Sequence, residues 1–260
     1  MLGIDVRIGT AQSTAGAGGI KLIERTAQLG LAGAEPMIDS PDSEYLSWSS
    51  AEIMPFMRTA KAMSVSLPTT AVSIFNGDDS LVTTEGRKNA ISIIRRSLAF
   101  SALIGAKAML LCTYFASNPD TRQKKSNLFE LLRQAEPTAR DLGVAIALES
   151  PLPAAELIKM VDVIESDYVG VYYDVGNAIF LGYDPAEEIK LLGKRILSIH
   201  IKDTAKNLGD SHLGQGRLDL DSAMAALDKI NYDNWLIIET PAGNDEAIRK
   251  DIKIISKYIR

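Results

Sequence analysis

Four polar residues interrupt or follow apolar runs in the second half of the chain, where a valine or leucine would fit at no cost. They are Glu149 in IALES, Asp174 in YYDVGN, His200 in SIHIKD and Glu239 in LIIET. A charge buried in such a run is costly unless it is paired. Asp174 poses the problem most sharply, because a run that reads as a buried strand ends on a carboxylate before an expected turn at Gly176 and Asn177.

Together, the four side chains form a ligand set rich in oxygen, with a formal charge of roughly −3 at neutral pH. A divalent cation neutralises such a set compactly, and three carboxylates with one imidazole suit Mn²⁺ or Mg²⁺ better than a metal that prefers thiolates. Taken singly, each carboxylate could be a helix cap or a solvated loop charge, and His200 could be a core histidine. Their position on consecutive predicted strands favours one metal site, with Mn²⁺ expected and Mg²⁺, Co²⁺ or Zn²⁺ as alternatives.

A metal held in this way would leave coordination positions for the carbonyl and a neighbouring hydroxyl oxygen of a ketose. Such a chelate acidifies the adjacent C–H bond and stabilises an enediolate. Glu149 and Glu239 could then remove a proton from one face and return it to the other face, or to the next carbon. The first outcome is epimerisation and the second is aldose–ketose isomerisation. The residues alone leave both open.

The elements that position these residues repeat one unit along the chain: a short apolar run, a turn, and a stretch with helical spacing. Glycines that follow the helical stretches, as in LG at 29–30 and 142–143, predict left-handed helix ends. Eight runs predict strands: IDVRIGT (4–10), AGAEPMI (32–38), SLPTTAVSIF (66–75), AKAMLLCTYF (106–115), GVAIALES (143–150), VGVYYDVG (169–176), ILSIHIKD (196–203) and NWLIIET (234–240).

Apolar strands joined by helices predict an α/β fold with a parallel sheet covered by helices. Eight such units in 260 residues fit a (β/α)8 TIM barrel, and we expect residues 1–260 to form a single barrel domain. A doubly wound sheet is the rival, but its dinucleotide-binding form needs G-x-G-x-x-G after the first strand, and TAQSTAGAGGIK lacks that pattern. In a barrel the functional side chains stand at the carboxyl ends of the strands, as the four residues do.

The segments LES, YYDVGN, HIKDT, HLGQGRLD and IIET resemble the xylose-isomerase-like TIM barrel superfamily of sugar isomerases, epimerases and endonuclease IV, over residues 140–241. DVGN and HIKDT are most similar to the L-ribulose 5-phosphate 3-epimerase and hexulose-6-phosphate isomerase branch. D-tagatose 3-epimerase is a more distant relative, with a histidine where this chain has Asn177. The resemblance implies the four metal ligands, acid and base roles for Glu149 and Glu239, and a sugar or sugar phosphate substrate near Asn177. Homo-oligomers, dimers or tetramers, are common in the family.

The loop that follows ILSIHIKD is expected to cover the site. Lys206 and Arg217 could hold substrate hydroxyls or a phosphate, or could be solvated instead. Lys202 could do the same or pair with a neighbouring acid, and His212 could lie beside the metal ligands or at the surface. Three aromatic residues could wall the pocket or pack in the core: Trp48, Phe75 and Phe115.

Composition excludes several partners. The net charge of −5, with no Lys/Arg run longer than two, is unsuited to nucleic acid. No apolar stretch is long enough for a membrane span, charges in the first thirty residues leave no room for a signal peptide, and Cys112 reads as a core residue in a reducing compartment, so we expect a cytoplasmic protein. A nuclease on this barrel would need a histidine-rich metal cluster, and the chain has 2 His. A metal-dependent lyase, such as an inosose-type dehydratase, stays an alternative.

Overall fold

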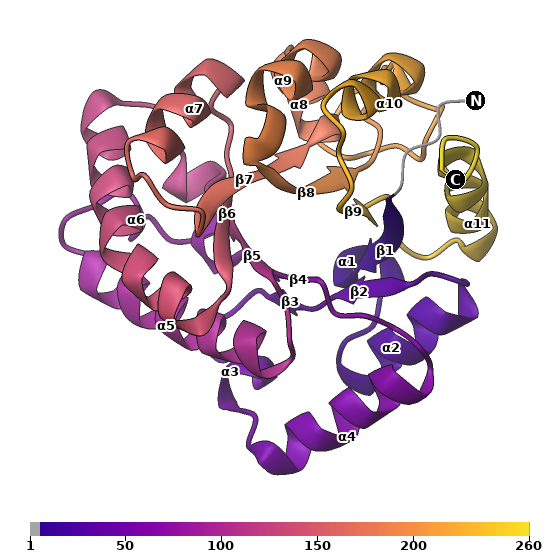
Figure 1. The fold of residues 1–260 in the computed structure, drawn as a ribbon, viewed down its shortest axis with the longest axis horizontal. Helices are drawn as coiled ribbons and strands as arrows, with labels where there is room; N and C mark the ends of the chain where they lie inside the picture. The colour runs from indigo at the N-terminus through magenta and orange to yellow at the C-terminus, as the bar shows by residue number, and fades with distance from the viewer. Residues whose placement is uncertain (1–5, 260) are drawn as a thin grey trace.

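One sheet of parallel strands forms the centre of the molecule, which is known from a computed structural model that describes residues 6–259. Its hydrogen-bonded order is β2-β1-β9-β8-β7-β6-β5-β4-β3. Figure 1 shows these strands around a ring, with the helices packed outside it. The predicted α/β fold with a TIM barrel is therefore confirmed. Residues 4 and 5 of the predicted first strand lie outside the described residues.

Each strand is shorter than the apolar run that predicted it, because the ends of the runs turn into loops and caps. The strands are Arg7–Ala11 (β1), Gly33–Glu35 (β2), Met37–Ile38 (β3), Thr69–Val72 (β4), Ala108–Cys112 (β5), Ala145–Glu149 (β6), Val169–Asp174 (β7), Ile196–Ile201 (β8) and Trp235–Ile238 (β9).

The run predicted as one strand over 32–38 is divided into two segments by Pro36. Proline has no backbone N–H for the sheet and fixes its own φ, so the ladder is interrupted at this residue. β2 pairs with β1 on one side, whereas β3 pairs with β4 on the other. The carbonyl of Pro36 still accepts from Ala71 N at 2.9 Å. The two segments together occupy the place of the second barrel strand, which reconciles nine segments with the eight predicted strands.

Helices follow the strands and cover the outer face of the ring. The longest, α6, begins after the N-cap Thr121 and ends at Gly143, whose φ of 66° confirms the predicted left-handed end. The helices are Gln12–Ala15 (α1), Gly19–Gln28 (α2), Glu44–Ser47 (α3), Ser50–Ala62 (α4), Arg87–Leu103 (α5), Arg122–Leu142 (α6), Ala154–Asp162 (α7), Val175–Leu181 (α8), Pro185–Leu192 (α9), Leu220–Lys229 (α10) and Asp245–Ile255 (α11), with 3-10 turns at Ile74–Asn76 (η1), Phe115–Ser117 (η2) and Gly193–Arg195 (η3).

The turn expected at Gly176 and Asn177 is wrong, because these residues lie inside α8. Asp174 ends β7 and caps the helix, accepting the backbone N–H of Asn177 on Oδ1 at 2.9 Å. A carboxylate at the N-cap satisfies a backbone donor that the first turn would otherwise leave free. The same residue therefore ends a strand, begins a helix, and keeps its second oxygen, Oδ2, for another partner.

The strands are apolar because both of their faces are covered, one by the barrel interior and the other by the helices. All the residues of β5, β6, β7 and β9 are buried. Within residues 6–259, none of the helices combines the length and the apolar character that a bilayer crossing requires. Burial in the strands leaves their carboxyl ends as the place where polar side chains can meet.

Candidate metal centre

The four predicted ligands stand at the carboxyl ends of adjacent strands. Glu149 is the last residue of β6, Asp174 the last of β7, and Glu239 directly follows β9. The register of the sheet places Asp174 opposite His200 on β8. Glu149, Asp174 and His200 are 5%, 4% and 2% exposed, so their polar groups are removed from bulk water.

The Nδ1 atom of His200 faces the three carboxylates. It lies 3.2 Å from Oε2 of Glu239, 3.8 Å from Oδ2 of Asp174 and 3.9 Å from Oε1 of Glu149. One ligand atom each from Glu149, Asp174 and His200 can be chosen within 4.8 Å of one another, a spacing at which they could hold a metal ion. The structure thus brings the four side chains together, as the positions of the strand ends predict.

Several buried polar atoms in this group have no hydrogen-bond partner among the described residues. They include Nδ1 of His200, Oδ2 of Asp174 and Oδ1 of Asn177. Buried polar atoms are nearly always satisfied, and a group of unsatisfied atoms that converge indicates a missing ion or ligand. Two of these atoms are of the types that bind Mn²⁺ or Mg²⁺. The donor set therefore fits a divalent ion.

Glu35, at the end of β2, supports His200 from the far side of the ring. Its Oε1 lies 2.8 Å from Nε2 of His200, and its Oε2 accepts from Thr69 Oγ1 at 2.6 Å and from the hydroxyl of Tyr172 at 2.7 Å. The carboxylate beside Nε2 favours a proton on that nitrogen, so when His200 is neutral the lone pair of Nδ1 faces the carboxylates. This is the tautomer that a metal ligand requires.

The sequence reasoning gave Glu35 no role. The signal was present in AGAEPMI, where a glutamate interrupts an apolar run directly before a proline. Glu35 is fully buried, and its three partners come from β4, β7 and β8. A charged residue inside a predicted strand, followed by a proline that can end that strand early, is the pattern that points to Glu35.

Lys202, for which the sequence left open a substrate contact or a pairing with a neighbouring acid, reaches into the centre and pairs with acids there. Its Nζ lies 2.5 Å from Oε2 of Glu239 and 2.8 Å from Oδ2 of Asp174. The Asp174 contact is an ion pair without the alignment of a hydrogen bond, since Oδ2 has no hydrogen-bond partner. The adjacent Asp203 instead binds backbone amides. Lys202 is thus a fifth charged member of the centre.

Burial and mutual charge shift the titration of these groups in the metal-free protein. Burial raises the pKa of Asp174 to about 7, against the opposing charge of Lys202. For His200, burial acts to lower the pKa, but Glu239 and Glu35 outweigh it and raise the pKa well above the ordinary value. For Glu239, burial acts to raise the pKa, but His200 and Lys202 outweigh it and lower the pKa. Asp174 and His200 therefore hold their protons to higher pH than usual when no ion is bound.

Asn177 lies inside the centre. Its side-chain Nδ2 donates to Oε1 of Glu149 at 2.9 Å, while its backbone N–H donates to Oδ1 of the N-cap Asp174. The amide therefore fixes the orientation of one carboxylate and leaves its own Oδ1 without a partner. A free acceptor beside the predicted ligands is suited to a hydroxyl group of a bound sugar.

The loop after β8 folds around Asp203. The fully buried carboxylate of Asp203 accepts four backbone N–H groups, those of Thr204, Gly214, Gly216 and Leu218, at 2.8 to 3.1 Å. A side chain on Gly216 would collide with this carboxylate, so the close approach requires glycine. The loop is therefore held by these bonds, and it runs from the candidate metal centre to the start of α10.

Three loop residues with predicted substrate contacts face elsewhere. Nδ1 of His212 lies 2.7 Å from Oδ2 of Asp251 on α11, which ties the loop to the last helix. Lys206 is exposed. Arg217 is exposed and donates to the carbonyl of Ile179 at 3.4 Å. The structure thus brings Asn177 to the predicted ligands. The side chains of the other three residues contact α8 or α11 or are exposed to solvent.

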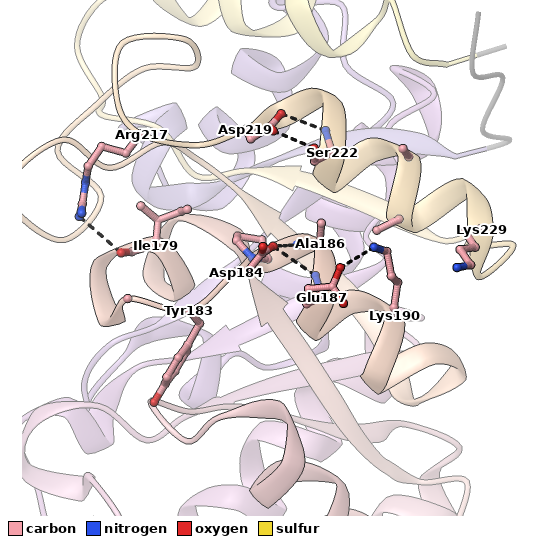
Figure 2. Close-up of a pocket in the computed structure, with 14 residues that line it drawn as sticks. Ile179, Tyr183, Asp184, Ala186, Glu187, Lys190, Arg217, Asp219, Ser222 and Lys229 are labelled. Carbon is pink, nitrogen blue, oxygen red and sulfur yellow. Dashed lines mark hydrogen bonds and ion pairs between the residues drawn. The ribbon is translucent and has the colours of Figure 1, made fainter.

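Arg217 lines a groove of about 600 Å³ outside the barrel, between α8, α9 and α10. Figure 2 shows this groove, with Arg217 reaching toward Ile179 at one end and Lys190 and Lys229 at the other. The Asp184 and Asp219 carboxylates already cap α9 and α10. None of the four predicted metal ligands lines the groove, which is therefore distinct from the centre.

The three aromatic residues that could wall the pocket or pack in the core divide between core and surface. Phe75 is fully buried in the main hydrophobic core. Trp48 packs edge-on against Tyr45, with ring centroids 4.8 Å apart. Phe115 is 68% exposed, at a backbone φ of 51°. Of these three residues, Phe115, on the turn after β5, is the most exposed.

Comparison with protein families gives one match that spans most of the chain. The family described as "Xylose isomerase-like TIM barrel" matches residues 23–258. A relative from Escherichia coli (strain K12), "Putative L-ribulose-5-phosphate 3-epimerase SgbU", is 27% identical over 225 residues, which is 79% of this chain and 77% of the relative. Inosose dehydratase of Geobacillus kaustophilus (strain HTA426) is 26% identical over 113 residues, only 36% of each protein.

Solved structures share the fold over nearly the whole chain. The crystal structure of a D-tagatose 3-epimerase-like protein superimposes with a TM-score of 0.82 at 20% identity, covering 97% of this chain and 96% of that one. At this identity the likeness establishes the barrel and leaves the chemistry to the side chains described above.

Proposed function

Because this chain belongs to the xylose isomerase-like TIM barrel family, we propose that it is a divalent-metal-dependent epimerase or isomerase of a ketose or ketose phosphate. The observation that carries the proposal is the pair of buried ligand atoms that have no hydrogen-bond partner among the described residues, Nδ1 of His200 and Oδ2 of Asp174, beside Glu149 and Glu239. A structural barrel would have no use for such a set. The similarity to a relative named as an L-ribulose-5-phosphate 3-epimerase supports the substrate class.

Glu149, Asp174, His200 and Glu239 would hold the ion, and Mn²⁺ fits three oxygen ligands and one imidazole. When bound, the ion would supply Lewis-acid chemistry, holding two adjacent substrate oxygens and stabilising the negative charge that develops when a C–H proton leaves. Glu35 keeps the tautomer of His200 correct for this role, since it accepts the Nε2 proton.

Glu149 and Glu239 are proposed to move the proton. They come from β6 and from the end of β9, with the strands of Asp174 and His200 between them, so they can flank a substrate held at the centre. Lys202, 2.5 Å from Glu239, and Asn177, 2.9 Å from Glu149, orient the two carboxylates separately. One glutamate removes the proton as general base, and the other returns one as general acid.

Preference for a phosphorylated substrate is proposed on the basis of Lys206 and Arg217. Both are exposed on the loop that leaves the centre after β8, where barrels commonly bind phosphate. Arg217 would have to release the carbonyl of Ile179, a contact of 3.4 Å, to reach a phosphate. Turnover of a ketopentose or ketohexose phosphate should then exceed that of the free sugar, by roughly a hundredfold if the contact is bidentate.

A dehydratase is the second candidate, favoured by the similarity to inosose dehydratases over about two fifths of the chain. Dehydration begins with the same proton removal beside a carbonyl, but it ends with loss of a hydroxyl group. The two functions therefore share the ligands and differ in the product.

One experiment separates these functions. The Mn²⁺-loaded protein is incubated in D2O with ketoses and their phosphates, and with an inosose, and the products are identified by NMR. An epimerase introduces solvent deuterium at the inverted carbon, an isomerase at the neighbouring carbon, and a dehydratase yields an unsaturated or dicarbonyl product with loss of water. Activity that survives complete removal of metal by a chelator would contradict the proposal.

A further inference from the structure

The side chain of Lys202 reaches the metal centre through a narrow passage. A Cβ atom on Gly176 would lie 2.5 Å from Cγ of Lys202, and one on Gly209 would lie 3.2 Å from Cδ. The residue is only 7% exposed. Because two glycines leave just enough room for the stem of the lysine, the fold delivers its ammonium group to one fixed position.

At that position the ammonium contacts two of the oxygens that would hold the predicted ion. Oε2 of Glu239 and Oδ2 of Asp174 lie 2.5 and 2.8 Å from Nζ, and the same two atoms lie 3.2 and 3.8 Å from Nδ1 of His200. In the part of the chain that the structure describes, Asp174 and Glu239 form ion pairs with His200 and Lys202 alone. An ion bound at Nδ1 would therefore have the ammonium as its nearest positive neighbour.

The charges explain why a lysine belongs there. Glu149, Asp174 and Glu239 carry three negative charges when ionised, and one divalent ion would leave one of them uncompensated in a buried site. Unbalanced buried charge is costly, and the Lys202 ammonium offsets the charge that remains on these three carboxylates. Without the ion, the ammonium still holds two of the carboxylates against their mutual repulsion.

We propose that Lys202 is a resident counter-cation of the centre: it keeps Asp174 and Glu239 in place when the ion is absent, and it weakens binding of the ion by like-charge repulsion. This inference rests on the proposed metal site. The protein would accordingly fold without metal and exchange its ion readily, because a positive charge next to the site opposes tight binding.

The test compares Mn²⁺ affinity in three proteins: the wild type, Lys202→Met and the matched control Lys194→Met. Methionine keeps an unbranched apolar stem, one heavy atom shorter than lysine, and removes the charge. Lys194 is exposed just before β8, at the opposite end of the same strand. Affinity is measured from the free Mn²⁺ EPR signal, and thermal unfolding is followed with and without Mn²⁺.

Lys202→Met should bind Mn²⁺ at least tenfold more tightly than the wild type, and its metal-free form should melt at a lower temperature. Saturation with Mn²⁺ should narrow that difference in melting temperature. Lys194→Met should match the wild type in both measurements. Equal or weaker Mn²⁺ binding by Lys202→Met would overturn the proposal, because it would assign Lys202 to positioning the ligands alone.

Two outcomes of this experiment require a further comparison. If Lys202→Met does not fold without metal, Lys202→Gln is purified with Mn²⁺ and its affinity is obtained by competition with a chelator. If the wild type binds no divalent ion, the metal requirement in the proposed function fails. In that case, Mn²⁺ binding by Lys202→Met would still support the counter-cation, and no binding by either protein would reject both ideas.

Discussion

Oε1 of Glu35 lies 2.8 Å from Nε2 of His200, although 165 residues separate the two in the chain. The contact joins the end of β2 to β8 across the interior of the barrel. It determines which nitrogen of His200 carries a proton, and thereby leaves Nδ1 to face Glu149, Asp174 and Glu239.

Glu35→Gln should lower Mn²⁺ affinity by about 10- to 100-fold, the usual effect of removing a partner that orients a metal-bound histidine. The glutamine can offer an N–H to Nε2, which would allow the wrong tautomer. ¹⁵N NMR of His200 in the metal-free protein, at a pH high enough to keep the ring neutral, reads this change directly. Glu188→Gln is the control, because Glu188 is also a buried carboxylate that accepts a tyrosine hydroxyl, 3.2 Å from Tyr173.

Asp174→Asn tests the ligand set without removing the helix cap. Asparagine keeps an oxygen for the backbone N–H of Asn177, so α8 should remain, whereas the charged ligand atom is lost. Because outer-sphere changes already cost about 10- to 100-fold, Mn²⁺ affinity should fall at least a hundredfold, and His200→Ala should act similarly. Asp219→Asn, at the exposed cap of α10, should leave it unchanged. Normal metal content in both His200→Ala and Asp174→Asn, measured by elemental analysis, would refute the site.

Glu149→Gln and Glu239→Gln should each lower turnover by about 10²–10⁴-fold, since glutamine keeps an oxygen for the ion but cannot carry the proton. The loss in turnover should exceed any loss in Mn²⁺ occupancy. Steady-state kinetics at saturating Mn²⁺ and deuterium incorporation from D2O provide the measurements. If one variant is nearly active and the other silent, a single base performs the reaction.

The pH dependence should be opposite for stability and for metal binding. The folded-state pKa values of His200 and Asp174 are raised, the latter to about 7. Protonated His200 stabilises the metal-free fold fully at pH values below its pKa in the unfolded chain. This stabilisation is lost as the pH rises through the pKa of His200 in the folded protein. Deprotonation of Asp174 likewise destabilises the metal-free fold between its unfolded pKa near 4 and about 7.

Metal must displace these protons, so Mn²⁺ affinity should rise with pH. The rise should approach about tenfold per pH unit for each proton released. Calorimetric titrations in buffers of different ionisation enthalpy would count the protons. Binding that is independent of pH from 6 to 8 would contradict the assignment of Asp174 and His200 as ligands.

Asp203→Asn should destabilise the protein by on the order of 2 to 4 kcal/mol, because an amide cannot accept the four backbone N–H groups that the carboxylate satisfies. The urea midpoint measures the change. Asp233→Asn, an exposed position, is the control. Since the loop begins at Lys202, the variant should also change Mn²⁺ affinity, whereas a loop independent of the centre would leave it unaltered.

The sequence predicted the barrel and the meeting of Glu149, Asp174, His200 and Glu239 because both follow from the spacing of apolar runs and from where parallel strands end. Position along a strand is a local property. The contacts of Glu35 and Lys202 were not predictable in the same way, since the first depends on a partner across the barrel and the second on a path between two glycines. Loop side chains were the least predictable: Arg217 and His212 took partners on α8 and α11.

The interruption of the second barrel strand at Pro36 creates a weak point in the hydrogen bonding of the sheet, which we call the seam. β2 contains three residues and β3 contains two, and Pro36 between them has no N–H to donate to a neighbouring strand. Amide hydrogen exchange should therefore be fastest here among the strands. Glu35 is the residue just before the seam, so transient opening would release Nε2 of His200 and disturb the centre. Bound ion should in turn slow exchange along β2, a coupling between local breathing of the wall and occupancy of the site.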